Sequence, residues 1–229
     1  GPAPMHPFDA KRCEWLAMYW IYDYCVGFMA NWGVHHLDIA QWGVPEVSEK
    51  PFEVSGRAVY PESGMTNTTV LWNTEFKYES GLRLSFTNAM DDKWRDQYAA
   101  LVGQDKIDSV GPYNKIGCRF NGSEGWVHVD RAGIWAEPAS LLEVKLKPTD
   151  KPLHASADHY ADFIKSVSTR EDPVAPVVTG HRASVLGCVA ELAVRLGRPL
   201  KWDPVAEHFF GDQEATAMMK RPMREPWSM

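Results

Sequence analysis

The sequence is poor in the residue patterns that build metal and nucleic-acid sites. Its four cysteines, Cys13, Cys25, Cys118 and Cys188, are scattered and form no Cys-x-x-Cys pair, which excludes a zinc knuckle or a dense disulfide framework. No tract of Lys and Arg interleaved with aromatic residues occurs, and the net charge is −6. Because phosphate backbones are bound by clustered cations, we expect no nucleic-acid partner.

Further absences concern the membrane and the nucleotide phosphates. The apolar stretch from residue 15 to 34 is interrupted by Asp23 and Asn31, so we expect no membrane span and no membrane partner. The Pro-rich residues 1–4 do not read as a secretory signal, and we expect a processed or truncated product whose location, cytoplasmic or periplasmic, stays open. No Gly-x-Gly-x-x-Gly follows a strand, so this chain is not expected to cradle a dinucleotide.

The chain nevertheless has ample material for a core. It contains 229 residues, of which 45% are hydrophobic, and ten of them are Trp. We expect a single domain over residues 1–229. Within it, residues 1–12 form an extended segment, since each proline restricts the residue before it, and residues 200–229 form a C-terminal tail.

Short alternating runs of apolar and polar residues predict β-strands between residues 52 and 147. They lie at 52–60, 68–78, 82–87, 98–102, 117–121, 125–129, 133–136 and 142–146. Helical periodicity occurs at 29–42, at 155–168 with Ser156 as N-cap, at 179–196 with Thr179 as N-cap, and in a short helix that follows Asp212 and ends at Lys220. Short turns between the strands favour antiparallel or mixed pairing over crossovers.

These elements predict an α+β fold in which a largely antiparallel or mixed, open-faced sheet has helices packed on one face. The other face must meet solvent or a partner. Five aromatic residues exceed the need of one small core, and we therefore expect a homo-oligomer through the open face; they are Trp72, Phe76, Phe86, Trp126 and Trp135.

The most informative stretch surrounds His35. On a helix, positions 31, 35, 38 and 42 share one face, which would carry Asn31, His35, Asp38 and Trp42. An imidazole with polar neighbours one turn away on each side suits proton transfer. The alternative reading is an amphipathic helix with a half-buried histidine whose hydrogen bonds are satisfied.

A family resemblance rests on several segments. The run Gly33-Val34-His35-His36-Leu37-Asp38 resembles the Gly-x-His-x-x-Asp region of the glucose–fructose oxidoreductase / inositol dehydrogenase (Gfo/Idh/MocA) family. The chain is also similar to the bacterial members of this family in five further segments, at residues 123–127, 173–176, 197–204, 211–215 and 221–227. Full-length members pair a Rossmann domain that binds NAD(P) with a C-terminal α/β domain that supplies substrate contacts and the oligomer interface. This chain resembles only the second part.

The resemblance therefore implies an incomplete enzyme. The chain would bind a sugar or polyol, and a Rossmann domain supplied in cis or in trans would bind NAD(P). His35 falls where the family has the histidine that works on the substrate hydroxyl. Asn31 stands where an Asp is common, and Asp38 is expected to take over the role of that Asp. Candidate substrate contacts are Trp32, His36, Trp94 and Arg95.

One short match is a decoy. Glu49-Lys50-Pro51 repeats the tripeptide that carries a catalytic Lys in this family, but there it precedes the His motif and here it follows Asp38. We expect Lys50 to be a solvated turn residue.

Three alternatives stay open. The first is a metal-dependent hydrolase or isomerase, with a site built from His35, His36, Asp38 and either His154 or His159. The second is a non-catalytic module for binding or assembly. The third is NAD-dependent glycoside hydrolysis, which needs the same Rossmann domain as plain oxidation. The sequence does not identify the sugar.

Overall fold

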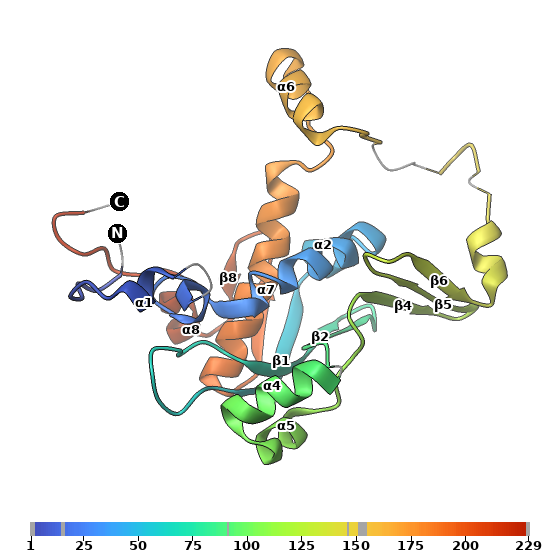
Figure 1. Ribbon diagram of the computed structural model, residues 1–229. Helices are drawn as coiled ribbons and strands as arrows, with labels where there is room; N and C mark the ends of the chain where they lie inside the picture. Colours follow the sequence, from blue (N-terminus) through green and yellow to red (C-terminus); the bar gives the residue numbers. More distant parts are fainter. Residues whose placement is uncertain (1–2, 15–16, 91, 146, 151–154, 228–229) are drawn as a thin grey trace. The chain divides into compact units, whose positions relative to one another are not determined.

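The computed structural model describes residues 3–14, 17–90, 92–145, 147–150 and 155–227. The chain divides into two compact units (Figure 1): Gly1–Ile116 together with Ala183–Met229, and Gly117–Arg182. Each unit is described by itself, and the single domain predicted over residues 1–229 stays a prediction.

The larger unit is built on a five-stranded sheet with the strand order β3-β2-β1-β7-β8. Its strands are β1 (Phe52–Val59), β2 (Leu71–Tyr78), β3 (Arg83–Thr87), β7 (Leu200–Asp203) and β8 (His208–Phe209). All four neighbouring pairs are antiparallel, and β1 pairs with β2 along its whole length. The antiparallel α+β fold is thereby confirmed.

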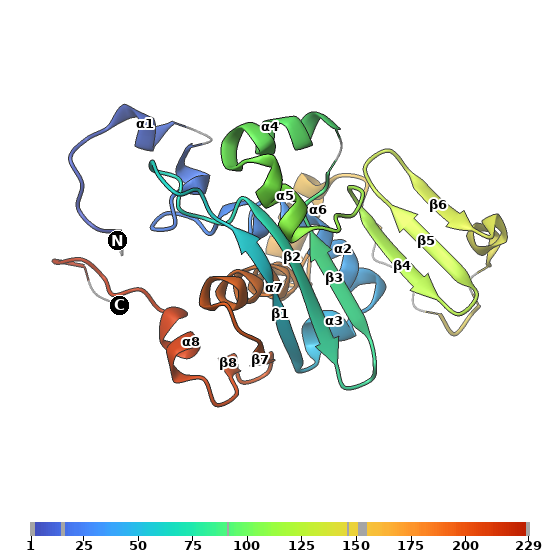
Figure 2. The ribbon, with the colours of Figure 1, turned by 90° about the horizontal axis from the view of Figure 1, so that it is seen from below.

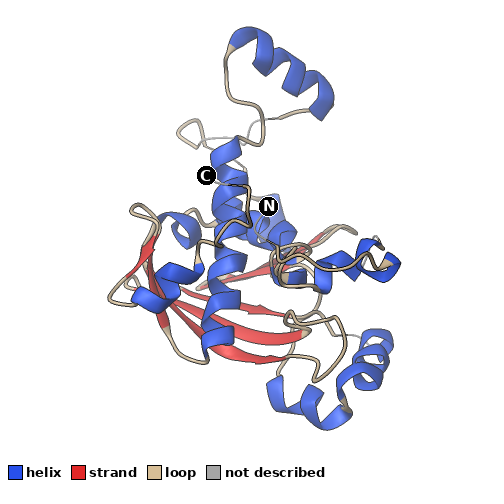
Figure 3. Ribbon diagram, turned by 90° about the vertical axis from the view of Figure 1, so that its left-hand side faces the viewer, coloured by secondary structure: helices blue, strands red, loops and turns tan. Residues whose placement is uncertain are grey.

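The larger unit also contains helices. They are α1 (Ala10–Cys13), η1 (Ala17–Trp20), η2 (Gly27–Met29), α2 (Gly33–Gly43), α3 (Glu46–Glu49), α4 (Asp92–Val102), α5 (Gln104–Val110), α7 (Val177–Leu196) and α8 (Gln213–Met218). Figure 3 shows α7 crossing the strands of the sheet. By length and mean hydropathy alone α7 would pass as a membrane span, but nine of its residues are buried in the protein, which is typical of a core helix.

The smaller unit carries a separate three-stranded antiparallel sheet (Figure 2). Its strands are β4 (Cys118–Gly122), β5 (Gly125–Val129) and β6 (Ile134–Glu137), and its helices are η3 (Ala139–Glu143) and α6 (His159–Thr169). Asp158, rather than the predicted Ser156, caps α6: its carboxylate accepts hydrogen bonds from the backbone N–H groups of Tyr160 and Ala161.

The two faces of the five-stranded sheet differ in chemistry. One face carries the large buried side chains, including Val54, Phe76 and Trp202, none of which is more than 1% exposed. On the opposite face the side chains of Glu53, Ser55, Arg57, Glu75, Lys77, Ser85 and Lys201 are exposed or half-buried. One end of that polar face is covered, where Val59 and Leu71 pack with Ile107 and Val110 of α5.

The predicted aromatic surface is therefore wrong for three of its members. Trp72, Phe76 and Phe86 are at most 7% exposed and belong to the core. They fill this core efficiently, because large rings bury the most apolar area per residue. Trp126 is half-buried and Trp135 exposed, both in the smaller unit. Self-association stays a prediction, but these rings no longer support it.

Two predicted strands are also wrong. Residues 98–102 are the last turn of α4, and their partly buried members Tyr98, Ala99 and Val102 recur at the i, i+1 and i+4 spacing of a helix. Residues 142–146 begin inside the 3₁₀ helix η3 and continue without a strand as far as residue 145, and residue 146 lies outside the described part. Runs of five residues are too short for the two periods to be separated.

A buried carboxylate joins α7 to the rest of the larger unit. Glu191 is fully buried and accepts hydrogen bonds from the Thr69 hydroxyl and from the guanidinium of Arg195, the latter at 2.6 and 3.1 Å. The same guanidinium lies over the ring of Tyr22 at 3.8 Å, and the guanidinium of Arg221 lies 4.6 Å from that ring. The ion pair thus links α7 to the segment before β2 and to Tyr22, and Arg221 of the C-terminal tail packs on the same ring.

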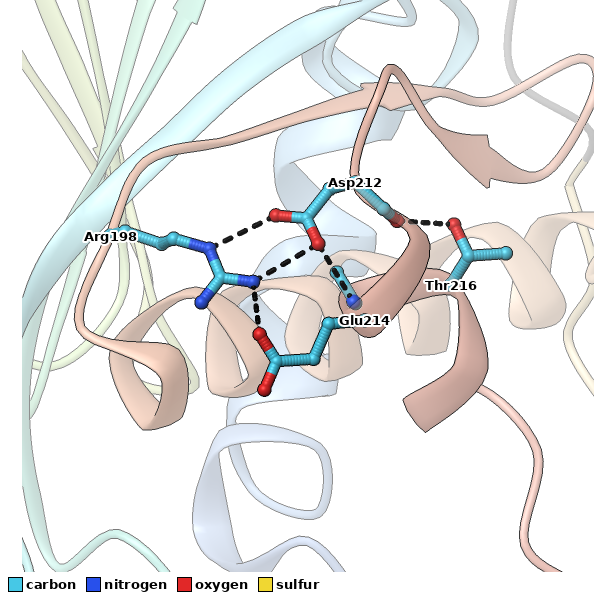
Figure 4. Close-up of polar contacts among 5 residues, drawn as sticks. Arg198, Asp212, Glu214 and Thr216 are labelled. Atoms are coloured by element: carbon cyan, nitrogen blue, oxygen red, sulfur yellow. Dashed lines mark hydrogen bonds and ion pairs between the residues drawn. The ribbon is translucent and has the colours of Figure 1, made fainter.

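The C-terminal tail has its own anchor, shown in Figure 4. The guanidinium of Arg198 donates to both carboxylate oxygens of Asp212 at 3.0 Å and to Glu214 at 2.7 Å. Arg198 is the main reason why the pKa of Asp212 lies below its ordinary value. Asp212 also caps α8 as predicted, since it accepts from the backbone N–H of Ala215.

We expect Glu191 to make stability depend on pH. Burial raises its pKa above the ordinary 4.5, against the opposing hydrogen bonds of Thr69 and Arg195. The folded state then holds the proton of the Glu191 carboxyl more tightly than the unfolded chain does. The stability that protonated Glu191 contributes is therefore fully present below about pH 4.5 and declines as the pH rises towards the raised pKa. As the pH rises, the melting temperature of the wild type should fall relative to that of Glu191→Gln.

Calorimetry at a series of pH values measures this difference, since about 1 kcal/mol moves the melting temperature of such a chain by roughly 2–4 °C. Glu79→Gln, at an exposed carboxylate in the turn between β2 and β3, is the matched control and should leave the profile of the wild type unchanged. Parallel profiles for the wild type and Glu191→Gln would contradict the assignment.

Candidate functional site

The segment from Gly27 to Gly43 contains the predicted site. It begins with the 3₁₀ turn η2, passes through residues 30–32 and continues as α2, which starts at Gly33. The helix therefore begins four residues later than predicted, and Asn31 lies before it. The backbone N–H of Asn31 donates to the carbonyl of Gly27 at 3.1 Å. The common helix face of the prediction thus holds only for His35, Asp38 and Trp42.

Three glycines let this segment approach its surroundings closely. Gly27 has a φ of +73°, and a Cβ there would lie 2.8 Å from the Thr68 hydroxyl. A Cβ on Gly33 would lie 2.5 Å from the ring of Phe86 on β3, and one on Gly187 of α7 would lie 2.7 Å from the carbonyl oxygen of Met29. Side chains at these positions would meet packed atoms, so the contacts fix the segment between α7, the chain before β2, and β3.

Helix α2 is two-sided. Its buried residues are Gly33, Leu37, Ala40 and Gln41, which lie at the i, i+4, i+7 and i+8 positions of one face. His35 lies on the other side and is exposed. His36 is half-buried and points about 100° away from His35, as adjacent helical residues do. Burial of the first face therefore holds the His35 imidazole towards solvent.

The surroundings of His35 are aromatic rather than acidic. The ring of Trp32, itself 44% exposed, meets the imidazole edge-on with the ring centroids 5.5 Å apart. Asp38 accepts a hydrogen bond from the side-chain amide of Gln41 at 2.8 Å. In the described part of the chain no hydrogen bond joins His35 to Asp38 or to Asn31. The prediction that Asp38 orients His35 stays a prediction, and the contacts of Asp38 in the structure give it no support.

Chemically, this surface offers one proton-transfer group beside one stacking platform. A histidine side chain can accept or donate a proton. The exposed indole of Trp32 presents an apolar face with a polar N–H. Such a pair suits a ligand that has both hydroxyl groups and C–H faces.

Trp94 and Arg95, predicted as substrate contacts, lie elsewhere. Both belong to α4, and Arg95 lines an open cleft of about 460 Å³ together with Met90, Asp108, Gly111, Pro112 and Tyr113. No residue of α2 is among those that line this cleft. Arg95 thus belongs to a cleft that does not include the His35 surface. Neither Asp108 nor Tyr113 was a candidate, because no sequence pattern links them to Arg95.

A metal centre finds no support in the described residues, where no three His, Cys, Asp or Glu side chains come together in a way that could hold an ion. Of the predicted ligands, His154 lies outside the described part of the chain, and His159 begins α6 in the smaller unit. The four cysteines are unpaired thiols. Lys50, as predicted, is an exposed residue at the end of α3.

Comparison with known proteins identifies a family for the C-terminal part. Residues 142–229 match the oxidoreductase family, C-terminal α/β domain, of the Gfo/Idh/MocA group. Among curated proteins, none matches this chain.

Solved structures that are similar to the chain include an oxidoreductase domain protein from Kribbella flavida, with 15% identity and a TM-score of 0.48 over 88% of this chain and 54% of that one. An NAD-binding protein from Listeria innocua has 12% identity and a TM-score of 0.47 over 78% and 48%. A myo-inositol dehydrogenase from Corynebacterium glutamicum has 14% identity and a TM-score of 0.39 over 77% and 52%. The chain spans about half the length of these structures.

The glycine contact of α7 can be tested by a matched pair of substitutions. In Gly187→Ala the added methyl group meets the backbone of Met29, which cannot yield as a flexible side chain would, and we expect a loss of roughly 1–3 kcal/mol in the free energy of unfolding. Gly180→Ala, in the same helix, meets nothing within 4 Å and should gain up to about 1 kcal/mol from helix propensity.

Urea unfolding followed by circular dichroism measures both changes. If Gly187→Ala were as stable as Gly180→Ala, the close approach of α7 to η2 would be refuted.

Proposed function

Residues 142–229 belong to the C-terminal α/β domain of the Gfo/Idh/MocA oxidoreductase family, and from this premise we propose that the chain is the substrate-binding and oligomerisation part of an NAD(P)-dependent oxidoreductase. Its substrate is a sugar or polyol, and the chain is not catalytically complete alone. The family match is the observation that carries this proposal. The pairing of His35 with the exposed ring of Trp32 supports the class of substrate.

The described residues do not fit a nicotinamide dinucleotide. Such cofactors lie on a parallel βαβ unit whose glycine-rich turn leads into a helix N-terminus, whereas every strand pair in the two described sheets is antiparallel. We therefore assign no residue of this chain to NAD(P). In the proposal a Rossmann domain, in cis or in trans, binds it.

His35 is the proposed proton acceptor. A substrate hydroxyl placed beside the imidazole would give up its proton to a ring nitrogen, and the carbon would lose a hydride, for which NAD(P) on the Rossmann domain would be the acceptor. Trp32 would stack on the C–H face of the sugar ring and hold that hydroxyl in place. Asn31, before the helix, and the half-buried His36 supply hydrogen-bonding groups to other hydroxyls. Asn31 is an amide, so it can orient a ligand but cannot stabilise an imidazolium as a carboxylate does.

The oligomerisation part of the proposal concerns the polar face of the five-stranded sheet. Its charged pairs include Glu53 with Lys201 at 4.0 Å and Glu75 with Lys77 at 3.6 Å. A partner copy on this face would be held by hydrogen bonds and ion pairs, and salt would weaken the assembly.

The activity is tested with the chain supplied with the Rossmann domain of the proposal, in cis or in trans. We expect NAD(P) reduction with a panel of aldoses and cyclic polyols, and a loss of roughly 100- to 10,000-fold in kcat for His35→Gln, the usual contribution of a general base. His159→Gln, at an exposed histidine in the smaller unit, is the matched control and should retain wild-type kcat.

Two outcomes would overturn the proposal. If substrate bound but the wild type reduced no nicotinamide, the chain would be a binding or assembly module. If His35→Gln and His159→Gln had equal activity, the proton would go to another group.

A further inference from the structure

The cleft beside Arg95 lies on the other side of the sheet from the His35 surface. Phe86, which meets Gly33 at the start of α2, points to the apolar face of β3. The next residue, Thr87, points to the opposite face, as alternate residues of a strand do, and its hydroxyl accepts from the backbone N–H of Asn114 at 3.1 Å. Asn114 directly follows the cleft residues 111–113. The cleft is therefore a site separate from the His35 surface.

Its floor is part of a packed core. Met90 and Tyr113, which line the cleft, pack against the buried cluster of Val59, Val70, Leu71, Ile107 and Val110. The Tyr113 hydroxyl donates to the carbonyl of Ile107 at 2.7 Å, which fixes the ring. An apolar surface whose side chains are already ordered loses little conformational entropy when a ligand covers it.

The wall of the cleft is fixed in the same way. The guanidinium of Arg57 donates to the carbonyl of Gly111 at 3.3 Å, and the side-chain amide of Asn73 donates to the carbonyl of Pro112 at 2.9 Å. These donors belong to the strands β1 and β2. Each carbonyl oxygen has a second lone pair, so the wall can still accept hydrogen bonds from a ligand.

The charges of the cleft cancel. Nη1 of Arg95 donates to Oδ1 of Asp108 at 3.1 Å, and both side chains are exposed by 40% or more. The side-chain amide of Gln104 donates to the same Oδ1 at 3.0 Å. The remaining guanidinium N–H groups and the other carboxylate oxygen can therefore donate to and accept from one ligand. Since the pair is neutral overall, an anion would be repelled by Asp108 as much as it is attracted by Arg95.

We propose that this cleft binds a neutral, hydroxyl-rich ring, a monosaccharide or cyclic polyol, at a site separate from His35. One C–H face of the ring lies on Met90 and Tyr113, while neighbouring hydroxyl groups bridge Arg95 and Asp108. Its volume of about 460 Å³ falls in the range of small-molecule sites. This binding goes beyond the proposed reaction and does not require it.

Methionine methyl NMR on the full chain tests the proposal with D-glucose as the probe. The Met90 methyl group reports on the cleft, and that of Met29, next to the His35 segment, reports on the other surface. We expect a saturable shift of Met90 with a millimolar dissociation constant. In Arg95→Gln and in Asp108→Asn, each of which removes charge-assisted hydrogen bonds, the constant should rise about tenfold or more.

The matched control is Lys106→Gln on α5, because Lys106 pairs with Glu62 and does not line the cleft; its dissociation constant should equal that of the wild type. D-Glucuronate, the carboxylate of the same ring, should bind no more tightly than glucose.

Three results would overturn the proposal: no saturable Met90 shift up to roughly 100 mM glucose, equal affinity in Arg95→Gln and the wild type, or tighter binding of glucuronate. A shift of Met29 alone would support the His35 surface while refuting the cleft, so the two proposals fail separately.

Discussion

The close backbone packing around Gly27, Gly33 and Gly187 is the constraint on which the His35 surface depends. Each glycine stands where a Cβ would meet packed atoms, so the segment before α2 lies against α7, Thr68 and Phe86. Because α2 buries Leu37 and Ala40 on one side, His35 and Trp32 are held outwards. The position of the proposed proton acceptor thus follows from contacts that contain no catalytic group.

The sheet separates two surfaces of different chemistry. Its apolar face supports α2 and with it the imidazole of His35, whereas its polar face, where α5 covers one end, supports the neutral Arg95–Asp108 cleft. Alternation along β3 assigns Phe86 to the first and Thr87 to the second. A ligand at one surface can therefore be distinguished from a ligand at the other.

Much of the fold could be predicted from the sequence. The long alternating runs that became β1, β2 and β3 and the cap at Asp212 were found because their signals are local and repeated. The strand predicted at residues 98–102 is wrong because five residues do not separate a strand from a helix turn. The open aromatic surface is wrong for Trp72, Phe76 and Phe86 because composition does not tell which face of a sheet a ring occupies.

The candidate site was predicted only in part. His35 and Trp32 lie close together because they are three residues apart at the N-terminus of α2, and such closeness can be predicted from the sequence. The pairing of Arg95 with Asp108 depends on how α4 and α5 fold back on each other, and no spacing reveals it. The buried Glu191 lies in an apolar helix, where Arg195 at i+4 is the one local sign of its ion pair.

The most direct test compares kcat for Gly33→Ala and Val54→Ala in the proposed enzyme, in which the chain works with a Rossmann domain. Both substitutions fall in the core, since Gly33 meets Phe86 and Val54 is fully buried, and both should cost roughly 1–3 kcal/mol of stability. If glycine packing positions His35, Gly33→Ala will lower kcat at least tenfold at a temperature where both variants are folded, and Val54→Ala will not. Equal kcat in the two variants would contradict the account.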